Sequence, residues 1–548
     1  MRPAYSVTTV RAAEAALMRH EHFPDELMRL AATAVAGTAQ AMLASSSSNR
    51  SPAYEPGPRV LVLAGPGGNG GDGMYAASFL QQQGESADVA LVSDNCHANA
   101  LAACRDAGCA VFPVQECTAR EGRAYDLIID GIAGLASARP IDEHTEHILD
   151  ATRRAGGLVL AIDMPTGIDA RTGVAASRCV VADATITFGW ARTGHVFAPE
   201  CGQVVISDLQ LPGGPVAFSQ ALADAGQAEA YLAYEPNEAC FTWPTAPLVD
   251  DERGLVTAPK PVGCTGPLVD PTPGIHATKY TGGVTTLCAG SSRYIGAGIL
   301  STGGAVNATP AMVQVVGQPE IVHHHPEVVR FDTVADARRT QSWVIGPGRG
   351  TDDQAAAELN LVLARREPTI IDADALRIIA HDESIRDAVR AHPFVVLTPH
   401  YGEFTALYES CVGPLPQEVG RAQLMSDLAQ ALDCFVMLKG RITHVTAPGV
   451  PVYGVNAGHS YAATPGSGDV LSGILGAVLA QQFFLAETEQ LSKREIDTAI
   501  MEILHANSLH IHASLEAART PHGMAIATAS RIADAIPAAL AKLLTMAR

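Results

Sequence analysis

The feature that most constrains the fold of this chain is a recurring unit, a short apolar run that ends in a turn rich in Gly, Asp or Ser. Residues 59–64 form such a run, the Gly-rich segment 65–73 follows it directly, and a helical pattern covers residues 74–83. Runs of the same kind follow at 88–92, 127–130 and 158–162. Alternation of buried strands with helical segments is typical of a parallel sheet with crossover helices. The sequence therefore predicts an α/β fold.

The same unit returns in the second half of the chain. Short strands are expected at 285–289, 343–345, 369–371, 395–397 and 435–438. Each of these runs leads into a polar or Gly-rich turn, and residues 296–306 read as a helix of small residues behind the first strand. In parallel sheets, ligands bind outside the carboxyl ends of the strands. The turns after these strands are therefore the places where a site is expected.

The length of the chain, 548 residues, exceeds what one hydrophobic core usually supports, so two domains are expected. Residues 1–215 are assigned to the first domain and residues 271–548 to the second. The segment 216–270 is rich in Pro and Gly and has no persistent period, which predicts a linker and the entry to the second domain. Within the first domain, helical spacing over residues 12–43 predicts one long helix outside the sheet.

Composition and charge exclude several classes of function. A net charge of −20 argues against binding to nucleic acid or to acidic membranes, although a local basic pocket for a nucleotide remains compatible with it. The 11 Cys include no CxxC pair, which indicates reduced, mostly buried thiols. No signal peptide and no membrane-spanning segment is predicted. We expect a cytoplasmic enzyme that acts on small molecules, and a homo-oligomer is compatible with the sequence.

One heptapeptide in the second half, Ala-Thr-Pro-Gly-Ser-Gly-Asp at 463–469, precedes an uncharged apolar run. Small residues that open a helix leave backbone N–H groups free to bind an anion. Asp469 would then lie beside a bound phosphate, where its carboxylate could take a proton from an attacking hydroxyl. The alternative is a Gly-rich turn in which Asp469 only caps a helix.

Polar residues also gather at strand ends in the first half. Asn69 and Asp72 lie in the Gly-rich segment, Asp130 ends one strand, and Asp163 and Thr166 follow another in a tight turn. Because these strand ends would meet at one edge of the sheet, we expect the side chains to form one polar site. Helix capping or a surface turn is the alternative for any single Asp.

These segments resemble a known family. The motifs GNGGDG at 68–73, DMPTGID at 163–169 and ADATITFG at 182–189, together with Asp130, resemble the NAD(P)HX epimerase domain over roughly residues 10–211. The resemblance implies a Rossmann-like three-layer domain, with Asp163 as the acid/base group at C6 of the hydrated nicotinamide. It implies K⁺ held by Asn69, Asp130 and Thr166. The residues implied to bind NADHX or NADPHX are Gly68, Asn69, Gly70, Gly71, Asp72, Gly134, Leu135, Ala136, Ser137, Ala138, Arg139, Pro140 and Asp163.

The second half resembles a ribokinase-like, ADP/ATP-dependent NAD(P)HX dehydratase domain over about residues 278–537. The resemblance implies a three-layer α/β/α domain that dehydrates the S hydrate at the expense of ADP, giving AMP and phosphate, with Asp469 as the base. It implies ADP or ATP as co-substrate, with Mg²⁺ brought by its phosphates. Residues implied to face the hydrate are Ala297, Gly350, His400 and Asp469. Those implied to bind the adenine nucleotide are Lys439, Gly440, Arg441, Ile442, Thr443 and Gly468.

The chain departs from the family patterns at several positions. In the first half these are Ala133, where an aromatic residue is usual, and Arg192, where a Lys is usual, which keeps the charge with a different geometry. In the second half they are Arg349, Tyr401 and Pro465.

Two other functions stay open from the residues themselves. A sugar or vitamin kinase fused to a nucleotide-binding domain could use the same Gly-rich motif and base, and a noncatalytic nucleotide-binding regulator could retain decayed motifs. The run His323-His324-His325 predicts a surface turn rather than a metal site, because three adjacent side chains cannot all face one ion in regular structure. His505, His510 and His512 are interpreted as packing or surface residues.

Overall fold

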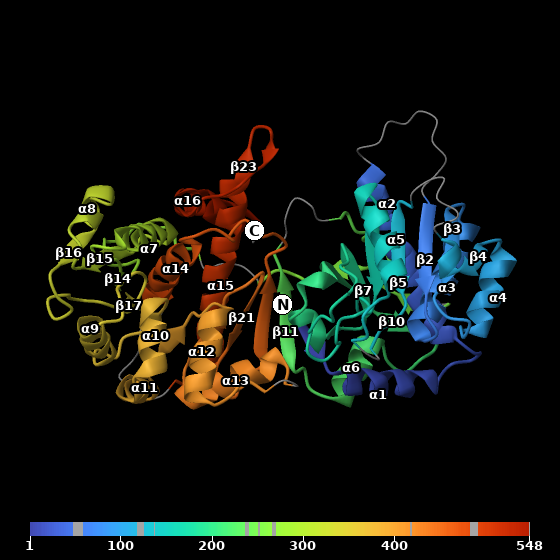
Figure 1. Cartoon of the computed structure of the whole chain (residues 1–548), viewed down its shortest axis with the longest axis horizontal. Coiled ribbons are helices and arrows are strands. Elements are labelled where there is room, and N and C mark those ends of the chain that lie inside the picture. The colour runs from blue at the N-terminus through green and yellow to red at the C-terminus, as the bar shows by residue number, and fades with distance from the viewer. Residues whose placement is uncertain are drawn as a thin grey trace. The chain divides into compact units, whose positions relative to one another are not determined.

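The computed structural model describes residues 1–47, 59–117, 125–135, 138–235, 241–249, 253–265, 270–416, 419–482 and 491–546. The chain divides into two compact units, Met1–Gly263 and Cys264–Arg548. Each unit has its own sheet and helices (Figure 1). The α/β fold class predicted for both halves is confirmed by the parallel sheets.

The first unit is built on a sheet in the order β13-β9-β7-β6-β5-β2-β3-β4. Every neighbouring pair is parallel except β13 with β9. The strands are β2 (Arg59–Ala64), β3 (Ser86–Leu91), β4 (Ala110–Pro113), β5 (Leu127–Gly131), β6 (Leu158–Ile162), β7 (Ala184–Phe188), β9 (Gln203–Ser207) and β13 (Lys260–Pro261).

Helices cover both faces of this sheet. Val60 and Val62 of β2 belong to a core shared with α2 and α3, whereas Leu61 and Leu63 belong to a second core shared with α5. Since side chains alternate across a strand, the two cores lie on opposite faces, and the unit has three layers. The helices are α1 (Val7–Met18), α2 (Glu26–Ser47), α3 (Gly68–Gln82), α4 (Ala98–Ala107), α5 (Glu143–Arg154) and α6 (Phe218–Ala225).

The prediction of one long helix over residues 12–43 is wrong, because the segment forms α1 and α2 with a break between them. Pro24 lacks a backbone N–H for a helix interior, and Asp25 has a φ of 68°, outside the helical region. Helix α2 is long and apolar enough, by length and composition, to span a membrane, yet it packs on the sheet as a core helix through Leu30, Val35 and their neighbours.

The start of the chain is tied into this unit by a small sheet. Strand β1 (Arg2–Tyr5) pairs antiparallel with β11 (Ala230–Tyr234) and parallel with β8 (Ala191–Arg192). In the second pairing Tyr5 lies opposite Arg192. This register places α1, which begins at Val7, beside the end of β7 and its turn.

The segment predicted as a linker, 216–270, forms regular elements in its described part and belongs to the first unit up to Gly263. It contains α6, β11 and β13, and β12 (Leu255–Val256) pairs with β10 (Leu209–Gln210). Its Pro and Gly content reflects short elements joined by turns, a pattern that a scan for long periodic segments does not detect.

The second unit is built on a sheet whose consecutive neighbours are β16-β15-β14-β17-β18-β19-β20-β21-β22. The pairs are parallel as far as β20, and β20-β21-β22 is antiparallel. The strands are β14 (Val284–Cys288), β15 (Met312–Val316), β16 (Val329–Phe331), β17 (Ser342–Ile345), β18 (Thr369–Ile371), β19 (Val395–Leu397), β20 (Phe435–Leu438), β21 (Ile442–Thr446) and β22 (Val452–Asn456).

Two groups of helices pack on this sheet. On one side, α14 packs with α7 and α15, and the hydroxyl of Ser342 on β17 donates to the carbonyl of Gly476 in α14. A second group contains α9 to α13. The helices are α7 (Ile295–Ala308), α8 (Glu320–His324), α9 (Asp353–Leu363), α10 (Asp374–His381), α11 (Glu383–Arg390), α12 (Tyr401–Cys411), α13 (Arg421–Leu432), α14 (Ser467–Gln482), α15 (Lys493–Ala518) and α16 (Ala529–Met546).

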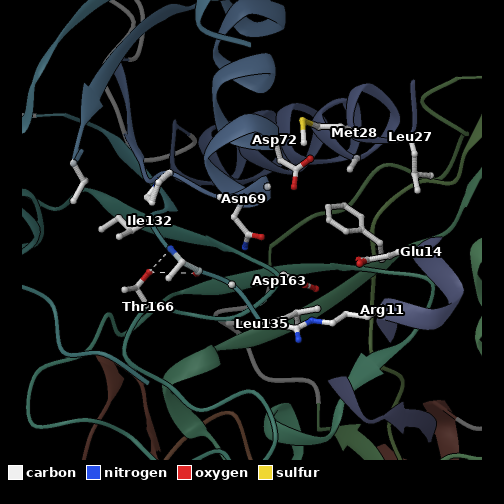
Figure 2. A pocket seen from close by; sticks show the side chains of 18 of the residues that line it. Arg11, Glu14, Leu27, Met28, Asn69, Asp72, Ile132, Leu135, Asp163 and Thr166 are labelled. Atoms are coloured by element: carbon white, nitrogen blue, oxygen red, sulfur yellow. Dashed lines mark hydrogen bonds between the residues drawn. The ribbon is translucent and has the colours of Figure 1, made fainter. Parts of the chain in front are cut away.

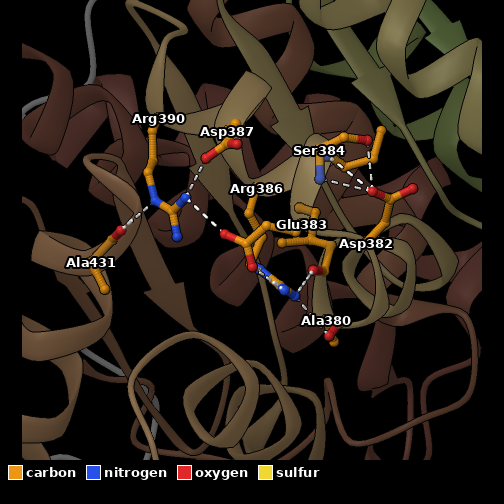
Figure 3. Close-up of polar contacts among 10 residues, drawn as sticks. Ala380, Asp382, Glu383, Ser384, Arg386, Asp387, Arg390 and Ala431 are labelled. Atoms are coloured by element: carbon orange, nitrogen blue, oxygen red, sulfur yellow. Dashed lines mark hydrogen bonds and ion pairs between the residues drawn. The ribbon is translucent and has the colours of Figure 1, made fainter.

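Charged side chains join α10, α11 and α13 (Figure 3). Asp382 caps α11 by accepting from the backbone N–H groups of Ser384 and Ile385. Arg386 donates to the carbonyls of Ile379 and Ala380 at the end of α10. Arg390 donates across to the carbonyl of Ala431 in α13, at 3.0 Å. These contacts satisfy helix-end carbonyls that would otherwise lack partners.

The histidines outside the predicted sites have structural places. His323 and His324 are exposed at the end of the short helix α8 rather than in a turn. His505, His510 and His512 are buried on α15. Within the described ranges, no group of three His, Cys, Asp or Glu side chains is arranged to hold a metal ion, and the cysteines there are free.

Candidate active sites

A pocket of about 830 Å³ opens in the first unit at the carboxyl ends of its strands. Figure 2 shows side chains from α1, α2 and α3 and from the turns after β5 and β6 directed into it. Of the residues implied to bind the hydrate or the cation, those that line it are Gly68, Asn69, Asp72, Gly134, Leu135, Arg139, Pro140, Asp163 and Thr166. Gly70, Gly71, Ala138 and Asp130 do not line it, and Ala136 and Ser137 lie outside the described residues.

From Gly68 onward, the Gly-rich segment forms the first turns of a helix, whereas the sequence analysis began the helix at residue 74. Helix α3 begins at Gly68, with Gly67 as its N-cap, so Asn69 and Asp72 lie on the helix itself. A side chain at Gly70 would meet the carbonyl oxygen of Gly65 at 2.0 Å, which requires glycine there. The helix N-terminus therefore approaches the end of β2 closely, and its free N–H groups form an anion-binding end next to the pocket.

Asp130 lies behind the pocket and holds the turn that follows β6. Its Oδ1 accepts from the Thr166 hydroxyl at 2.7 Å, and its Oδ2 accepts from the Thr166 backbone N–H at 2.8 Å. The Thr166 hydroxyl oxygen also accepts from the N–H of Ala133, at 3.1 Å. Asn69 is fixed separately, because its Nδ2 donates to the carbonyl of Ile162 at 2.6 Å. The structure thus brings Asp130 and Thr166 into contact and places Asn69 at the adjoining turn.

The environment of Asp130 fits a bound monovalent cation. Burial raises the pKa of its carboxyl to about 6, and among the residues that the structure describes no Lys or Arg pairs with it. The carboxylate of Asp130 and the hydroxyl of Thr166 meet here, and Asn69 is held at the end of the adjoining strand β6, so the residues present offer hard oxygen donors of low total charge. A cation there would supply the charge that the protein does not.

Asp163 is held by several groups in an unusual backbone conformation. Its φ is 64°, a region that non-glycine residues rarely adopt. Oδ1 accepts from the Thr187 hydroxyl at 2.7 Å and lies 2.8 Å from Nη2 of the fully buried Arg192. His195 Nε2 lies 2.6 Å from the Asp163 carbonyl oxygen, and its Nδ1 accepts from the Arg192 backbone N–H. Burial lowers the pKa of His195 to about 4, so the neutral ring donates through Nε2.

The sequence analysis missed the contribution of α1 to this pocket. Arg11 and Glu14 line it, and Figure 2 shows the Glu14 carboxyl directed toward Asp163 and Asp72. Burial, then the charge of Asp163, raise the pKa of Glu14 to about 7. Burial raises the pKa of Asp72 well above its usual value. One sequence signal could have singled out Glu14. It is a charged residue next to Val10, Ala13 and Leu17 on the face that the helical pattern of α1 directs inward.

In the second unit, three of the four residues implied to face the hydrate lie at helix starts, and the fourth, Gly350, contacts one. Ala297 is in the first turn of α7, His400 caps α12, and Asp469 is in the first turn of α14. Gly350 donates its N–H to Oδ2 of Asp374, the first residue of α10. His400 also forms a backbone bridge with Lys439.

Asp469 lies among charged groups that change its titration. Burial, then the charge of Asp372, raise its pKa to about 7, while Lys439 lowers it. Lys439 Nζ donates to Asp372 Oδ1 at 2.6 Å, and Ser472 on α14 donates to Asp372 Oδ2 at 2.5 Å. Asp372 is buried and ties β18 to β20 and α14. The sequence analysis did not include Asp372 among the site residues.

The segment predicted to bind the nucleotide forms the hairpin between β20 and β21. Lys439 lies close to Gly468, since a side chain there would meet Lys439 Nζ at 3.3 Å. Gly440 and Arg441 are exposed, and Arg441 donates to the Ser460 hydroxyl at 3.0 Å. The side chains of Ile442 and Thr443 are buried. Ile442 therefore has only its backbone to offer a ligand.

Two of the departures from the family pattern in the second half have structural partners. Arg349 forms a paired contact with Glu358, with Nη2 2.5 Å from Oε1, and donates to the carbonyl of Gly290 at 3.0 Å. It joins α9 to the turn after β14. Tyr401 is exposed and lies beside Phe404 on the first turn of α12.

Comparison with known proteins decides the family. A family model described as NAD(P)H-hydrate dehydratase matches residues 285–538, and one described as YjeF-related protein N-terminus matches residues 24–194. A protein of Corynebacterium glutamicum named bifunctional NAD(P)H-hydrate repair enzyme Nnr is 37% identical, with 99% of each chain covered. This chain belongs to the bifunctional NAD(P)H-hydrate repair enzymes. A Mycobacterium leprae protein of the same name is 36% identical over 99% of this chain and 100% of its own length.

Solved structures resemble the second half of this repair-enzyme chain. The ADP/ATP-dependent NAD(P)H-hydrate dehydratase of Bacillus subtilis, co-crystallised with ATP/Mg²⁺, is 25% identical, with 50% of this chain and 95% of that chain covered and a TM-score of 0.39. The two matched ranges contain all the residues that the sequence analysis assigned to the two sites. Family membership also decides against the kinase and the noncatalytic regulator as alternatives. Glu14 lies outside both matched ranges.

Proposed function

We propose that this chain repairs hydrated NADH and NADPH with two separate sites, one in each unit. The first unit interconverts the R and S hydrates, and the second dehydrates the S hydrate at the expense of ADP, giving AMP and phosphate. The observation that carries this proposal is that relatives named as bifunctional repair enzymes match the chain over its whole length, with a matched domain around each site.

In the first unit, the hydrated nicotinamide nucleotide occupies the pocket that Asp163 and Asn69 line. The start of α3 faces the nucleotide phosphates, to which Arg11 and Arg139 add positive charge. Asp163 faces C6 of the ring as an acid/base group, and its ion pair with Arg192 keeps its carboxyl in one orientation.

A potassium ion is proposed beside Thr166, held by oxygens of Asn69, Asp130 and Thr166. Support comes from the buried carboxylate of Asp130, which lacks a cationic side-chain partner among the described residues. The ion would neutralise this carboxylate and orient the turn that carries Asp163. A large, weakly hydrated cation suits this sparse set of ligands better than Mg²⁺, which demands compact octahedral ligation.

In the second unit, Lys439 and the start of α14 bind the phosphates of ADP, and Asp469 faces the hydrate. Asp469 takes the proton of the C6 hydroxyl while the oxygen of that hydroxyl attacks the β-phosphoryl group of ADP, and AMP leaves. The C6–O bond then breaks, with the bonding electrons leaving on the phosphate, and the C5 proton passes to solvent, which restores the C5=C6 double bond. Water is thereby removed from the hydrate and recovered in the phosphate.

Mg²⁺ is proposed to arrive bound to the phosphates of ADP or ATP. This fits the absence, among the described residues, of a cluster of three acidic or His side chains arranged for a metal. The ion would neutralise charge on the transferred phosphoryl group. Lys439, which follows β20 in the β20–β21 hairpin, would add a second positive charge there.

The partners proposed here are NADHX, NADPHX and ADP, without nucleic acid, and a cytoplasmic location is proposed with them. The net charge of −20 and the free cysteines in the described ranges support this assignment.

The test is to offer the full chain a mixture of R and S hydrates with ADP or ATP and Mg²⁺, and to follow the recovery of reduced-nicotinamide absorbance. Recovery of the whole mixture is expected, since the R isomer is converted as the S isomer is consumed. Recovery of only the S fraction, with the R hydrate unchanged by chromatography, would remove epimerisation from the proposal. Absence of any nucleotide-dependent recovery would remove dehydration.

A further inference from the structure

The pocket of the first unit holds a carboxyl group whose role is unassigned. Glu14 lies on α1 and lines the pocket, and Figure 2 shows its carboxyl directed into the same space as those of Asp163 and Asp72. It reaches this place because Tyr5 of β1 pairs with Arg192 of β8, which anchors α1 beside the turn that carries Asp163. Helix α1 is capped at Ser6, whose hydroxyl accepts from the N–H of Thr9.

Glu14 and Asp163 have different electrostatic surroundings. Asp163 has a buried guanidinium at 2.8 Å and a hydroxyl donor at 2.7 Å from its Oδ1. Glu14 is half-buried, and its pKa is raised to about 7 by burial and by the charge of Asp163, against the lowering effects of Arg192 and Arg11. Asp72 is the other acidic group that interacts with it. Near neutral pH, Glu14 can therefore hold a proton that it could donate inside the pocket.

We propose that Glu14 is the second acid/base group of the epimerase, paired with Asp163 across the ring of the hydrate. This inference rests on the proposed epimerase function of the first unit. Inversion at C6 requires the hydroxyl to leave from one face of the ring and water to add from the other. Two carboxyl groups in one pocket, one to donate a proton to the leaving hydroxyl and one to accept a proton from the incoming water, match this requirement, as they do in other reactions that invert a carbon bearing oxygen.

The steps balance without any further reactant. Glu14 donates its proton to the C6 hydroxyl, which leaves as water, while the N1 lone pair forms a C6=N1 iminium bond. A water molecule on the opposite face attacks C6, the iminium electrons return to N1, and Asp163 takes the proton of that water. The reverse reaction exchanges the two roles. In both directions the pair must carry one proton, which returns to Glu14 through solvent after the product leaves.

The test compares Glu14→Gln, Glu14→Asp and the control Glu116→Gln in the full chain, with R-to-S conversion followed by chromatography. Glu14→Gln should slow epimerisation about 10²-fold or more, because the amide keeps the shape and cannot donate the proton. Glu14→Asp should recover a large part of the rate. Glu116 is exposed in the short 3-10 helix that follows β4 and does not line the pocket, so its variant should match the unchanged protein. Dehydration of the pure S hydrate should be equal in all four proteins.

Two further readouts separate proton transfer from a structural role. In the unchanged protein, kcat/KM for epimerisation should fall as pH rises above about 7, where Glu14 loses its proton, and Glu14→Gln should lose this limb. In water enriched in ¹⁸O, each inversion should place one solvent oxygen at C6. The inference is overturned if Glu14→Gln epimerises at the normal rate, if Asp72→Asn alone removes activity, or if the original oxygen is retained. If the unchanged protein does not epimerise, the proposed function itself fails.

Discussion

Nη2 of Arg192 lies 2.8 Å from Oδ1 of Asp163, and the guanidinium is fully buried. The same guanidinium donates through Nη1 to the carbonyls of Phe188 and Trp190, at 3.1 and 2.8 Å. Arg192 therefore fixes both the turn after β7 and the carboxyl that faces the pocket. A Lys could supply the charge here but not the second set of contacts.

Arg192→Met should damage the first unit in stability and in activity. It leaves the Asp163 carboxylate buried without its partner, which costs about 3–5 kcal/mol when one member of a buried pair is removed. Arg192→Lys should keep part of the epimerase activity and lose less stability. Chemical denaturation and R-to-S conversion measure the two effects. Equal stability of Arg192→Met and the unchanged protein would show that the pair contributes nothing to folding.

Asp130→Asn should abolish the response of the first unit to potassium. In the unchanged protein, KCl should raise the melting temperature relative to a bulky organic-cation chloride at equal ionic strength, because an ion that binds only the folded state stabilises it. The variant should melt at the same temperature in both salts and should lose most epimerase activity. Asp106→Asn, on the exposed side of α4, serves as control. Identical melting of the unchanged protein in the two salts would contradict the cation site.

Asp163→Asn tests the other half of the epimerase assignment. The amide should stop epimerisation while the potassium-dependent rise in melting temperature and the dehydration of the S hydrate remain. The reason is that the amide cannot accept the proton of an attacking water but leaves Asp130 and Thr166 unchanged. Full epimerase activity in this variant would exclude Asp163 as an acid/base group.

Asp469→Asn should lower the rate of dehydration about 10²-fold or more. ADP binding, measured by calorimetry, should stay nearly unchanged. In the unchanged protein, kcat/KM for the S hydrate should rise with pH through about 7, because the pKa of Asp469 is raised to that value and only the carboxylate accepts a proton. Asp353→Asn, in the exposed first turn of α9, is the matched control. A pH profile in the Asn variant that follows the unchanged protein would assign the base to another group.

Lys439→Met should shift that rising limb to higher pH, because Lys439 lowers the pKa of Asp469. It should also weaken ADP binding about tenfold or more, because a charge-assisted contact with the phosphates is lost. The melting temperature of the second unit should fall, because the buried Asp372 loses the Lys439 ammonium as its partner. Thr443→Ala should weaken ADP binding without the pH shift. Lys542→Met, which removes a pair with Glu516 elsewhere, should change neither. A loss of epimerisation in these variants would instead indicate a general folding defect.

The sequence by itself determined the elements that carry the sites. Short apolar runs followed by Gly or Asp fix strands and helix starts locally, so β2 with α3 and the placement of Asp469 at the start of α14 follow from neighbouring residues. The carboxyl ends of parallel strands meet at one edge, so the gathering of Asn69, Asp163 and Thr166 around one pocket could also be predicted.

Only the tertiary structure decided the contacts between residues distant in the sequence. Glu14 enters the pocket because β1 pairs with β8, a register that no local pattern encodes. The break between α1 and α2 depends on the backbone conformation of Asp25. Asp372 acquires its place beside Lys439 and Ser472 in the same way. Burial and neighbouring charges, both of which arise only on folding, raise the pKa of Glu14 and of Asp469 to about 7. For this reason their titration near neutral pH could not be predicted from the sequence.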